Sequence, residues 1–274
     1  MNILIITSLY PNEKSQSVLN TSYAVHNFAK KWAIKHNVEV AKINIKSFEN
    51  LNKGNIFSKD LEDFELDYVK IKRYNIWKFP KLDFSRFQIN KLTNKIVSNN
   101  NRKYDVIICH MFYPSYLVST IFKIKFGVPI VLTLHNSDIL YIRKRKKRYL
   151  QLLDNLQFLN LILFRSNKIK TSFNNLINLN KLNITNDLAI SGIENKYIIP
   201  NEVLNEKIHK TNTSFILVAN MIPLKNIDIV ITAFNKLNLL YSEITLKIIG
   251  DGPLRNKLIK KASGNQNIKF TGLL

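Results

Sequence analysis

Two histidines end neighbouring apolar runs that read as buried strands. His110 closes the run at residues 104–110. His135 closes the run at 129–135 and opens a His-Asn-Ser-Asp segment that ends at Asp138. Imidazole and carboxylate groups can hydrogen-bond a ligand and exchange protons with it. Open α/β sheets bind ligands at the carboxyl ends of their strands, so these residues are candidates for a functional site.

A second set of residues is suited to phosphate. The segment at residues 219–226 (ANMIPLKN) follows an apolar run and places Lys225 at the start of a helical pattern. A helix N-terminus binds phosphate through its free N–H groups, and a lysine there adds a full charge. The Gly-Asp-Gly-Pro turn at residues 250–253 lets the backbone approach a flat ligand closely.

The elements that must position these residues alternate between short apolar runs and longer helical patterns. This alternation predicts parallel sheets that are covered by helices on both faces. The polar stretch at residues 201–214 separates two such series and reads as an interdomain linker. Strands are predicted at residues 2–7, 38–45, 68–74, 104–110, 129–135, 167–172, 196–200, 214–220, 244–250 and 267–270, and helices at 21–36, 113–127, 226–240 and 253–263.

The glycine content argues against two nucleotide-binding classes. The chain has only seven glycines, and it contains neither a G-x-G-x-x-G motif nor a phosphate-cradling P-loop. A dinucleotide-dependent dehydrogenase and a P-loop NTPase each need one of these motifs.

The composition indicates a basic protein of a reducing compartment. The chain has 41 Lys and Arg against 19 Asp and Glu, and the net charge of +22 favours phosphate-bearing partners. Part of this bias accompanies the many Asn, Ile and Lys residues that an AT-rich genome encodes. The single cysteine, Cys109, rules out an intramolecular disulfide and a cysteine-based zinc site. We expect a soluble cytoplasmic protein, because no signal peptide and no run of about 18 apolar residues is found.

Several segments together resemble the family 4 retaining glycosyltransferases of GT-B fold (glycosyl transferases group 1). Residues 104–139 resemble the signature of their N-terminal domain, and residues 197–203 (YIIPNEV) resemble the Ile-Pro-Asn-Gly-Val segment at their domain junction. Residues 215–274 resemble the first half of their nucleotide-sugar domain. The resemblance implies an α/β fold with two Rossmann-like domains of GT-B type, the second incomplete. They would be an acceptor-side domain at residues 1–205 and a partial nucleotide-sugar-binding domain at residues 206–274.

The resemblance also implies roles for individual residues. In the family, the residue in the position of His135 lines the cleft near the reacting sugar, so His135 is the catalytic candidate. His110 and Asp138 would lie on the acceptor side of the cleft, and Lys225 with Asn220 would hold the donor diphosphate. The nucleotide would be contacted by Gly250, Asp251, Gly252 and Gly272. The family needs no metal, because cationic groups and a helix N-terminus stabilise the departing diphosphate. The nucleoside-diphosphate sugar is then a co-substrate, and no cofactor is expected.

The sequence departs from the family pattern at several positions. Asn220 stands where the family has its diphosphate arginine, which removes one positive charge from the leaving-group site. Glu202 replaces the glycine of the Pro-Asn-Gly segment, and Asn226 replaces the glycine that follows the lysine. The first loop, at residues 10–22, lacks the double glycine that many members carry.

Each candidate also has a structural interpretation. His135 can hydrogen-bond backbone at its strand end, His110 can buttress the cleft wall, and Asp138 can cap the following helix. Lys225 can be a solvated surface lysine in a chain that is rich in lysine. The residues Gly250, Asp251 and Gly252 can serve the turn alone.

The run at residues 143–148 (RKRKKR) is the densest cluster of charge. A solvated helix face is one interpretation, and a dock for anionic lipid head groups is the other, because the apolar stretch at residues 149–164 follows. The membrane-surface candidates are Arg143, Lys144, Arg145, Lys146, Lys147 and Arg148. Nucleic-acid binding is not expected, since no recognised module with interleaved aromatic residues is found.

The catalytic glutamates of the family find no match in this sequence. Family 4 enzymes carry two glutamates separated by seven residues, and Glu194 and Glu202 have this spacing. They precede the nucleotide domain, however, and Pro200 between them would break the helix that the motif needs. In the family the motif lies beyond the strand that matches residues 267–270, where this sequence ends. We therefore expect sugar transfer by the 274-residue chain to be absent or very low.

The sequence predicts a bacterial-type retaining glycosyltransferase. It would move a hexose from a nucleoside-diphosphate sugar to a sugar hydroxyl on a glycan or lipid-linked acceptor, in surface polysaccharide, lipopolysaccharide or glycolipid assembly. Its expected location is cytoplasmic, peripheral on the inner face of the cell membrane. Two alternatives stay open. One is a truncated, non-catalytic remnant or one part of a split glycosyltransferase, and the other is a basic nucleic-acid-binding α/β protein.

Overall fold

The chain folds into two units, Met1–Gly192 and Ile193–Leu274. The computed structural model describes residues 1–12, 23–47, 62–79, 82–99, 103–178, 184–190, 192, 198–203 and 213–273. The boundary expected between residues 205 and 206 falls inside the second unit, in a stretch that lies outside the described residues.

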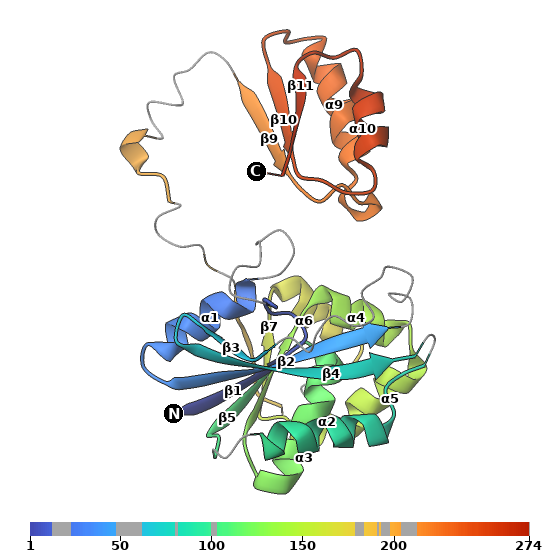
Figure 1. The fold of residues 1–274 in the computed structure, drawn as a ribbon. Helices are drawn as coiled ribbons and strands as arrows, with labels where there is room; N and C mark the ends of the chain where they lie inside the picture. Colours follow the sequence, from blue (N-terminus) through green and yellow to red (C-terminus); the bar gives the residue numbers. More distant parts are fainter. Residues whose placement is uncertain are drawn as a thin grey trace. The chain divides into compact units, whose positions relative to one another are not determined.

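The first unit is built on an eight-stranded sheet in the order β3-β4-β2-β1-β5-β6-β7-β8 (Figure 1). All neighbouring strands are parallel except β3 and β4, which are antiparallel. The strands are β1 (Asn2–Thr7), β2 (Asn37–Ser47), β3 (Phe64–Leu66), β4 (Val69–Lys78), β5 (Val106–His110), β6 (Ile130–Leu134), β7 (Leu161–Phe164) and β8 (Asn186–Leu188). The helices are α1 (Ala24–Ala33), α2 (Arg86–Ser98), α3 (Leu117–Phe126), α4 (Asn136–Arg143), α5 (Lys146–Asn155) and α6 (Asn167–Asn174).

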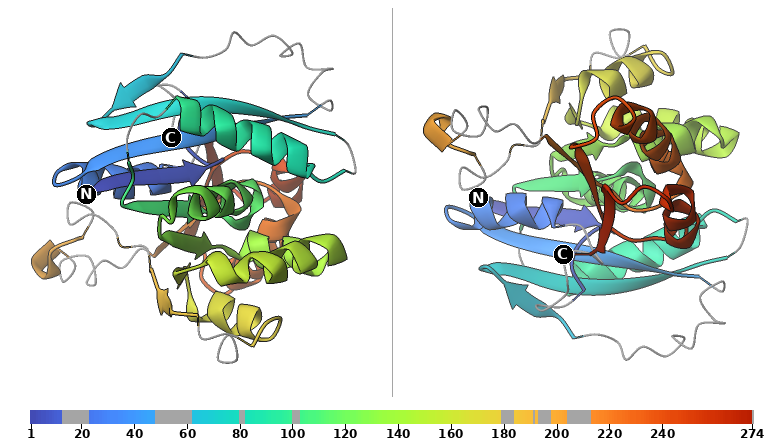
Figure 2. Two further views of the ribbon diagram at one scale, coloured as in Figure 1. Left: turned by 90° about the horizontal axis from the view of Figure 1, so that it is seen from below. Right: turned by 90° about the horizontal axis from the view of Figure 1, so that it is seen from above.

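Helices cover both faces of this sheet. Successive side chains of a strand point to opposite faces, so Ile3 and Ile5 of β1 pack in a cluster with Val25 of α1. Leu4 and Ile6 belong to the other cluster, which includes the buried faces of α2 and α3. Figure 2 shows α2 and α3 in front of the strands when the unit is seen from below, and α1 in the view from above.

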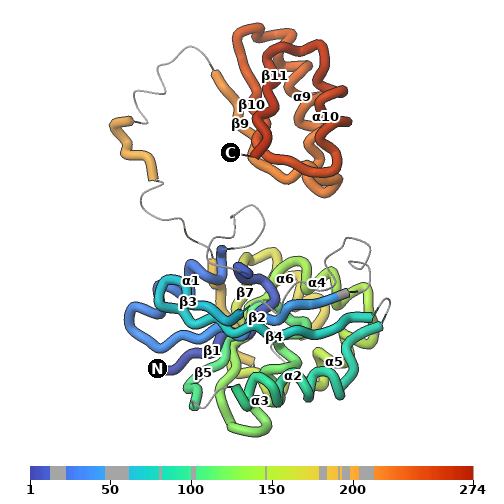
Figure 3. Tube along the Cα trace, in the orientation of Figure 1, coloured from blue at the N-terminus to red at the C-terminus, as the bar shows by residue number. Residues whose placement is uncertain are grey.

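The second unit has a parallel sheet in the order β11-β10-β9. Helices α9 (Ile227–Asn238) and α10 (Arg255–Ala262) lie on one side of the three strands, as Figure 3 shows. Its core contains Met221, Ile231, Phe234, Ile248 and Leu258 among other apolar residues. Its elements are β9 (Ser214–Val218), a 3₁₀ turn (Pro223–Lys225), α9 (Ile227–Asn238), β10 (Thr245–Ile249), α10 (Arg255–Ala262) and β11 (Ile268–Gly272).

The structure confirms most of the predicted strands and corrects two. Residues 167–172 were predicted as a strand but form helix α6, because Ser166 accepts a hydrogen bond from the Ile169 N–H at 3.3 Å. Ile169 and Phe173, four residues apart, are the buried positions of that helix. The predicted strand at residues 196–200 does not occur in its described part, residues 198–200. No helix within the described ranges is long and apolar enough to cross a membrane.

Two glycines let neighbouring loops of the second unit meet backbone to backbone. A Cβ added at Gly250 would lie 2.0 Å from the Ala219 carbonyl oxygen, and one at Gly252 would lie 2.7 Å from that of Met221. Between these loops the Met221 N–H donates to the Asp251 carbonyl at 2.8 Å. The loop after β9 and the loop after β10 are thereby held together at the carboxyl edge of the sheet.

Replacing Gly250 by alanine should destabilise the second unit far more than replacing Gly264. Both glycines have positive φ, 138° and 106°, so alanine strains the backbone at each. Nothing lies within 4 Å of a Cβ at Gly264. We expect Gly250→Ala to cost roughly 3 kcal/mol or more and Gly264→Ala about 1 kcal/mol.

The readout is hydrogen exchange of the β10 amides, because the chain's two tryptophans, Trp32 and Trp77, both lie in the first unit and do not report on the second. Equal loss of β10 protection in the two alanine variants would contradict the close backbone contact.

Candidate functional site

Four polar side chains line the carboxyl edge of the first sheet. Thr7 and His110 end β1 and β5 and are partners in the parallel register. Leu134 of β6 pairs with Phe164 of β7, so His135 and Arg165 each follow the end of a neighbouring strand. The structure thus brings His110 and His135 together, as their positions at the ends of adjacent strands predict.

The two histidine rings are in direct contact. The Nε2 atoms of His110 and His135 lie 2.8 Å apart, and the ring centroids are 4.6 Å apart at an interplanar angle of 72°. The Nδ1 atom of His110 lies 3.4 Å from the Thr7 Oγ1. A hydrogen bond between two Nε2 atoms needs one donor and one acceptor, so at least one ring of the pair is neutral.

The surroundings favour the neutral form of both rings. Burial, together with the neighbouring charges of His135 and Arg165, lowers the pKa of His110 to about 3. Burial, followed by the charge of Arg165, also lowers the pKa of His135. At neutral pH the pair can donate and accept hydrogen bonds but carries no positive charge.

Asp138 fixes the segments that carry the two histidines. Its Oδ2 accepts from the His135 N–H at 2.9 Å, and its Oδ1 accepts from the Phe112 N–H at 3.1 Å. Burial raises the pKa of the Asp138 carboxyl to about 6, against the opposing effect of these two hydrogen bonds. Both carboxylate oxygens of Asp138 therefore accept hydrogen bonds from the backbone of the loops after β5 and β6. This agrees with the interpretation in which Asp138 caps the following helix.

Arg165 is a site residue that sequence reasoning missed. It follows β7 directly, and its charge acts on the pKa of both His110 and His135. Its guanidinium lies over the ring of Phe28 of α1, 5.3 Å from the ring centroid, and burial lowers its own pKa. The only signal in the sequence was its position immediately after a buried strand. That strand was not predicted, because it lies within the long apolar stretch at residues 149–164.

A chain of hydrogen bonds from buried Tyr10 through buried His26 to exposed Asp67 anchors the segment that follows β1. The Tyr10 hydroxyl lies 2.7 Å from His26 Nδ1, and His26 Nε2 lies 2.9 Å from an Asp67 carboxylate oxygen. Tyr10 and His26 are each only 1% exposed. Burial, with the charge of Asp67, raises the pKa of Tyr10, so the phenol stays protonated. These contacts join the segment after β1 to α1 and to the turn between β3 and β4.

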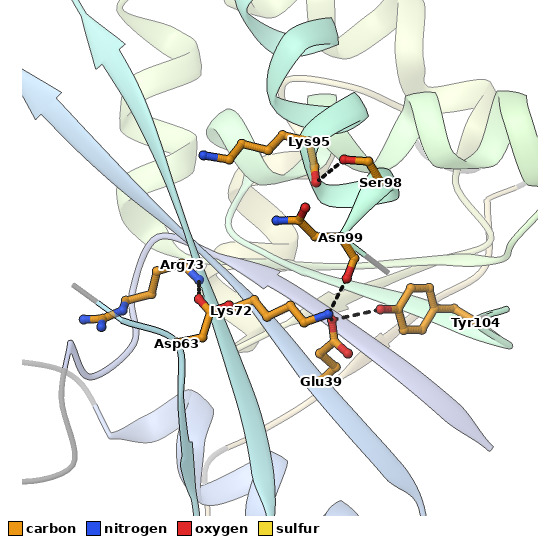
Figure 4. A network of polar contacts seen from close by, with 8 residues as sticks. All are labelled: Glu39, Asp63, Lys72, Arg73, Lys95, Ser98, Asn99 and Tyr104. Carbon is orange, nitrogen blue, oxygen red and sulfur yellow. Dashed lines mark hydrogen bonds and ion pairs between the residues drawn. The ribbon is translucent and has the colours of Figure 1, made fainter. Parts of the chain in front are cut away.

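Two cations hold the same segment from the sheet side. The Lys42 ammonium donates to the side-chain oxygen of Asn12, and the Arg73 guanidinium donates to the Asn12 carbonyl. Burial, with the neighbouring charge of Arg73, lowers the pKa of Lys42 to about 8. Figure 4 shows Lys72 leaving β4 in the opposite direction from Arg73, toward Glu39 at 3.4 Å. The two faces of β4 thus present cations to different partners.

The predicted diphosphate residues both belong to the segment between β9 and α9. Asn220 and Lys225 are exposed, and Lys225 closes the 3₁₀ turn just before α9. Asn226, the N-cap residue of α9, has φ 48°. Glycine adopts this left-handed conformation most easily and asparagine tolerates it, which explains how Asn226 can stand in a glycine position.

The predicted nucleotide-binding residues lie at the ends of β10 and β11. The Gly250 N–H donates to the Gly272 carbonyl at 2.8 Å. Asp251 is exposed, and its Oδ1 accepts from the Gly252 N–H at 2.7 Å. The structure therefore gathers these four residues at the carboxyl edge of the second sheet, next to the segment that carries Asn220.

Arg148 is not a membrane-surface residue, and that prediction is wrong. It is 1% exposed, its Nε and Nη2 lie 2.9 Å and 2.5 Å from Asp83 Oδ1, and its guanidinium lies 3.2 Å from the ring centroid of Tyr141. The side chain of Lys146 lies outside the described part of the structure. The remaining members of the run, Arg143, Lys144, Arg145 and Lys147, are exposed.

The apolar stretch after this run is divided between the core and the surface. Residues 149–164 divide between α5, a 3₁₀ turn and β7. The apolar side chains of Leu152, Leu156, Ile162 and Phe164 are buried in the core of the first unit. These four residues pack the first unit, whereas Leu150 and Leu153 of the same stretch are 48% and 37% exposed.

A hollow at the other end of the second unit holds none of the predicted residues. It encloses about 750 Å³ between the end of α9 and the segment before β11. Its asparagines bond one another, with the Asn265 amide donating to Asn235 at 2.8 Å. In the described ranges, no group of three or more His, Cys, Asp or Glu side chains is arranged to hold a metal ion.

Comparison with known proteins gives a family and several structural neighbours. The model of glycosyltransferase family 4 matches residues 23–183. HepE of Anabaena, solved with UDP and glucose, aligns with TM-score 0.62 and 17% identity over 100% of this chain and 70% of its own. The lipopolysaccharide outer core galactosyltransferase WaaB aligns with TM-score 0.60 and 15% identity over 100% of this chain and 68% of its own. The catalytic domain of starch synthase IV from Arabidopsis thaliana, bound to ADP and acarbose, aligns with TM-score 0.59 and 10% identity. The alignment covers 100% of this chain and 74% of its own. No curated protein matches the chain.

Removing the Arg165 charge should raise the pKa of both histidines. Burial stays in place in Arg165→Gln, so both pKa values should remain below the ordinary value of about 6.5. The measurement is an NMR titration of the histidine ring protons, with exposed Lys168 changed to glutamine as the control that removes one charge nearby. Unchanged titration of His135 in Arg165→Gln would show that the guanidinium does not act on the pair.

Proposed function

The chain belongs to glycosyltransferase family 4, and from this premise we propose that it transfers a hexose from a nucleoside-diphosphate sugar to a sugar hydroxyl, with retention of configuration. Its fold is of the GT-B type, as the sequence resemblance implies. The proposed acceptor is a glycan or lipid-linked sugar in surface polysaccharide, lipopolysaccharide or glycolipid assembly. A neighbour described as a lipopolysaccharide galactosyltransferase supports this class of acceptor, and one solved with UDP-glucose supports a uridine nucleotide as donor.

The observation that carries the proposal is the neutral His110–His135 pair at the carboxyl edge of the first sheet. Glycosyl transfer develops positive charge on the reacting sugar ring. A neutral His135 can hydrogen-bond a sugar hydroxyl there without repelling that charge. His110 contacts the His135 ring and orients it, and Asp138 holds the backbone of both loops in place.

The second unit would stabilise the departing diphosphate. Lys225 supplies a positive charge just before α9, and the first N–H groups of that helix point toward the same end. Asn220 can donate hydrogen bonds but brings no charge. Negative charge grows on the diphosphate as the glycosidic bond breaks, so donors fixed in advance lower the barrier, and this route requires no metal.

The proposed location is the cytoplasm, peripheral to the inner face of the cell membrane. The one cysteine, Cys109, is buried and has no partner for a disulfide, which suits a reducing compartment. The donor would bind from the cytoplasm, and a lipid-linked acceptor would be reached at the membrane surface.

Replacing Lys225 by alanine should weaken UDP binding about tenfold, the loss expected for one charge-assisted contact of roughly 1.4 kcal/mol. Isothermal titration of the full chain with UDP measures this change. Lys257, exposed on α10, provides the matched control, and Lys257→Ala should bind UDP as the unaltered chain does. Equal affinity of the Lys225→Ala and Lys257→Ala variants would remove Lys225 from the donor site.

A further inference from the structure

The hollow in the second unit is lined by amide side chains. Its volume of about 750 Å³ lies within the roughly 300–1,000 Å³ that small-molecule sites occupy. Four half-buried asparagines contribute to the lining, namely Asn235, Asn238, Asn265 and Asn267. None of them belongs to the histidine pair or to the predicted donor site, so the mechanism of transfer leaves this hollow unexplained.

Hydrogen bonds hold the four asparagines in fixed orientations. The Asn265 amide donates to Asn235 Oδ1 at 2.8 Å, and Asn265 Oδ1 accepts from the Asn267 N–H at 3.0 Å. The Asn267 amide donates to the Ser242 carbonyl at 2.7 Å and to Asn238 Oδ1 at 3.3 Å. Side chains that are already ordered lose little conformational entropy when they bind a ligand.

This network leaves both donors and acceptors unused. Among the residues that the structure describes, Asn235 Nδ2 and Asn267 Oδ1 have no hydrogen-bond partner. The Thr232 hydroxyl donates to the Asp228 carbonyl at 2.9 Å, so its oxygen can still accept. A ligand hydroxyl both donates and accepts, so a polyhydroxylated ligand can use both kinds of group.

The charge around the hollow does not favour an anion. Helix α9 ends at Asn238 and helix α10 ends at Ala262, and the two helices lie against each other (Figure 1). The last carbonyls of a helix carry partial negative charge. Lys236 and Lys261 stand in the last turns and offset that charge, and Lys261 also lies 3.8 Å from Asp228. The hollow is therefore suited to an uncharged ligand.

We propose that this hollow binds a segment of a neutral glycan. The amides supply uncharged donors and acceptors for sugar hydroxyls. Leu239, 86% exposed, is the apolar side chain of the described lining, and the C–H face of a sugar ring can pack against it. A bound peptide would call for a larger apolar surface, and a nucleotide would bring its phosphates to the negative ends of two helices.

The inference goes beyond the proposed transfer reaction and does not depend on it. The hollow lies at the opposite edge of the second sheet from the loops after β9 and β10, so glycan binding there requires no donor. A glycan held at this site raises the local concentration of polymer at the protein.

Amide NMR of the full chain tests the site with two neutral probes, maltohexaose and laminarihexaose. We expect at least one of them to shift the signals of residues 235–239 and 263–267 while residues 250–252 keep theirs. No shift in the hollow with either probe, in a sample that binds UDP, would overturn the inference and leave the proposed function standing. Shifts in the hollow of a sample that does not bind UDP would support the inference and count against the donor site.

An anionic probe distinguishes sugar recognition from attraction to a chain with a net charge of +22. Hexagalacturonate that shifts the hollow when neither neutral probe does so would overturn the proposal.

Replacing Asn235 by aspartate removes the unused donor and keeps the network. The carboxylate still accepts from the Asn265 amide, but the two N–H groups of Asn235 are lost. We expect glycan binding to weaken about tenfold, the loss that one hydrogen bond of the stronger kind accounts for. Asn256, exposed on α10 and outside the lining, provides the control for the added charge, and Asn256→Asp should bind within about twofold of the unaltered chain.

Two neighbouring leucines give a second matched comparison. Leu239 lines the hollow, whereas Leu240 is 77% exposed and lies outside its lining. Leu239→Ser should weaken glycan binding several-fold, and Leu240→Ser should bind within about twofold of the unaltered chain. Unchanged hydrogen exchange of the β10 amides shows that each variant keeps its fold. Equal losses in the two leucine variants, or in the two aspartate variants, would overturn the assignment of this hollow.

Discussion

The parallel register of the strands is the constraint on which the site depends. Parallel strands that pair in register end beside one another, so Thr7 meets His110, and His135 and Arg165 follow at the ends of the next two strands. Side chains that are far apart in sequence are forced into one row. The contact between the histidine rings then follows from the spacing of neighbouring strands. Arg165, at the end of the next strand, places its charge close enough to lower the pKa of both rings. In the second unit the loops after β9 and β10 meet through glycines at which an added Cβ would collide with the facing backbone.

The crowded edge is stabilised because its buried histidines are neutral and its buried carboxylate accepts hydrogen bonds. Burial and Arg165 keep the histidines neutral, which avoids two positively charged rings whose Nε2 atoms lie 2.8 Å apart. Asp138 offsets its own burial by accepting two backbone N–H groups. Arg148 and Asp83 bury opposite charges together. Removing one partner of such a pair costs more than the pair contributes, so these residues act as fixed supports.

Much of the fold could be predicted, because strand runs and helical spacing are local signals. The two histidines, Lys225 and the glycine turn were found for the same reason, since each directly follows a strand or precedes a helix. Helix α2 was missed although Ser85 and Gln88 form a capping box that the sequence displays. Helix α6 was misread as a strand because Ile169 and Phe173 give too few apolar positions to distinguish the two periods.

The supports of the site could not be predicted, because their partners are distant in the chain. Asp83 and Arg148 are 65 residues apart, and His26 and Asp67 are 41 apart. No local pattern records such a contact, and a single sequence carries no information on pairs. The basic run shows the consequence. Its members look alike in the sequence, but of the five whose side chains the structure describes, Arg148 turns inward to meet Asp83 and the other four are exposed.

The central claim is that the carboxyl edges of the two sheets carry the donor and acceptor sites of the transfer reaction. Backbone amide NMR of the full chain during addition of UDP tests it most directly. The account predicts chemical-shift changes in residues 219–226 and 250–252, at the edge formed by the loops after β9 and β10. It predicts no changes in residues 235–239 and 263–267, which line the hollow at the opposite edge. Shifts confined to that hollow, with none in residues 219–226, would contradict the account.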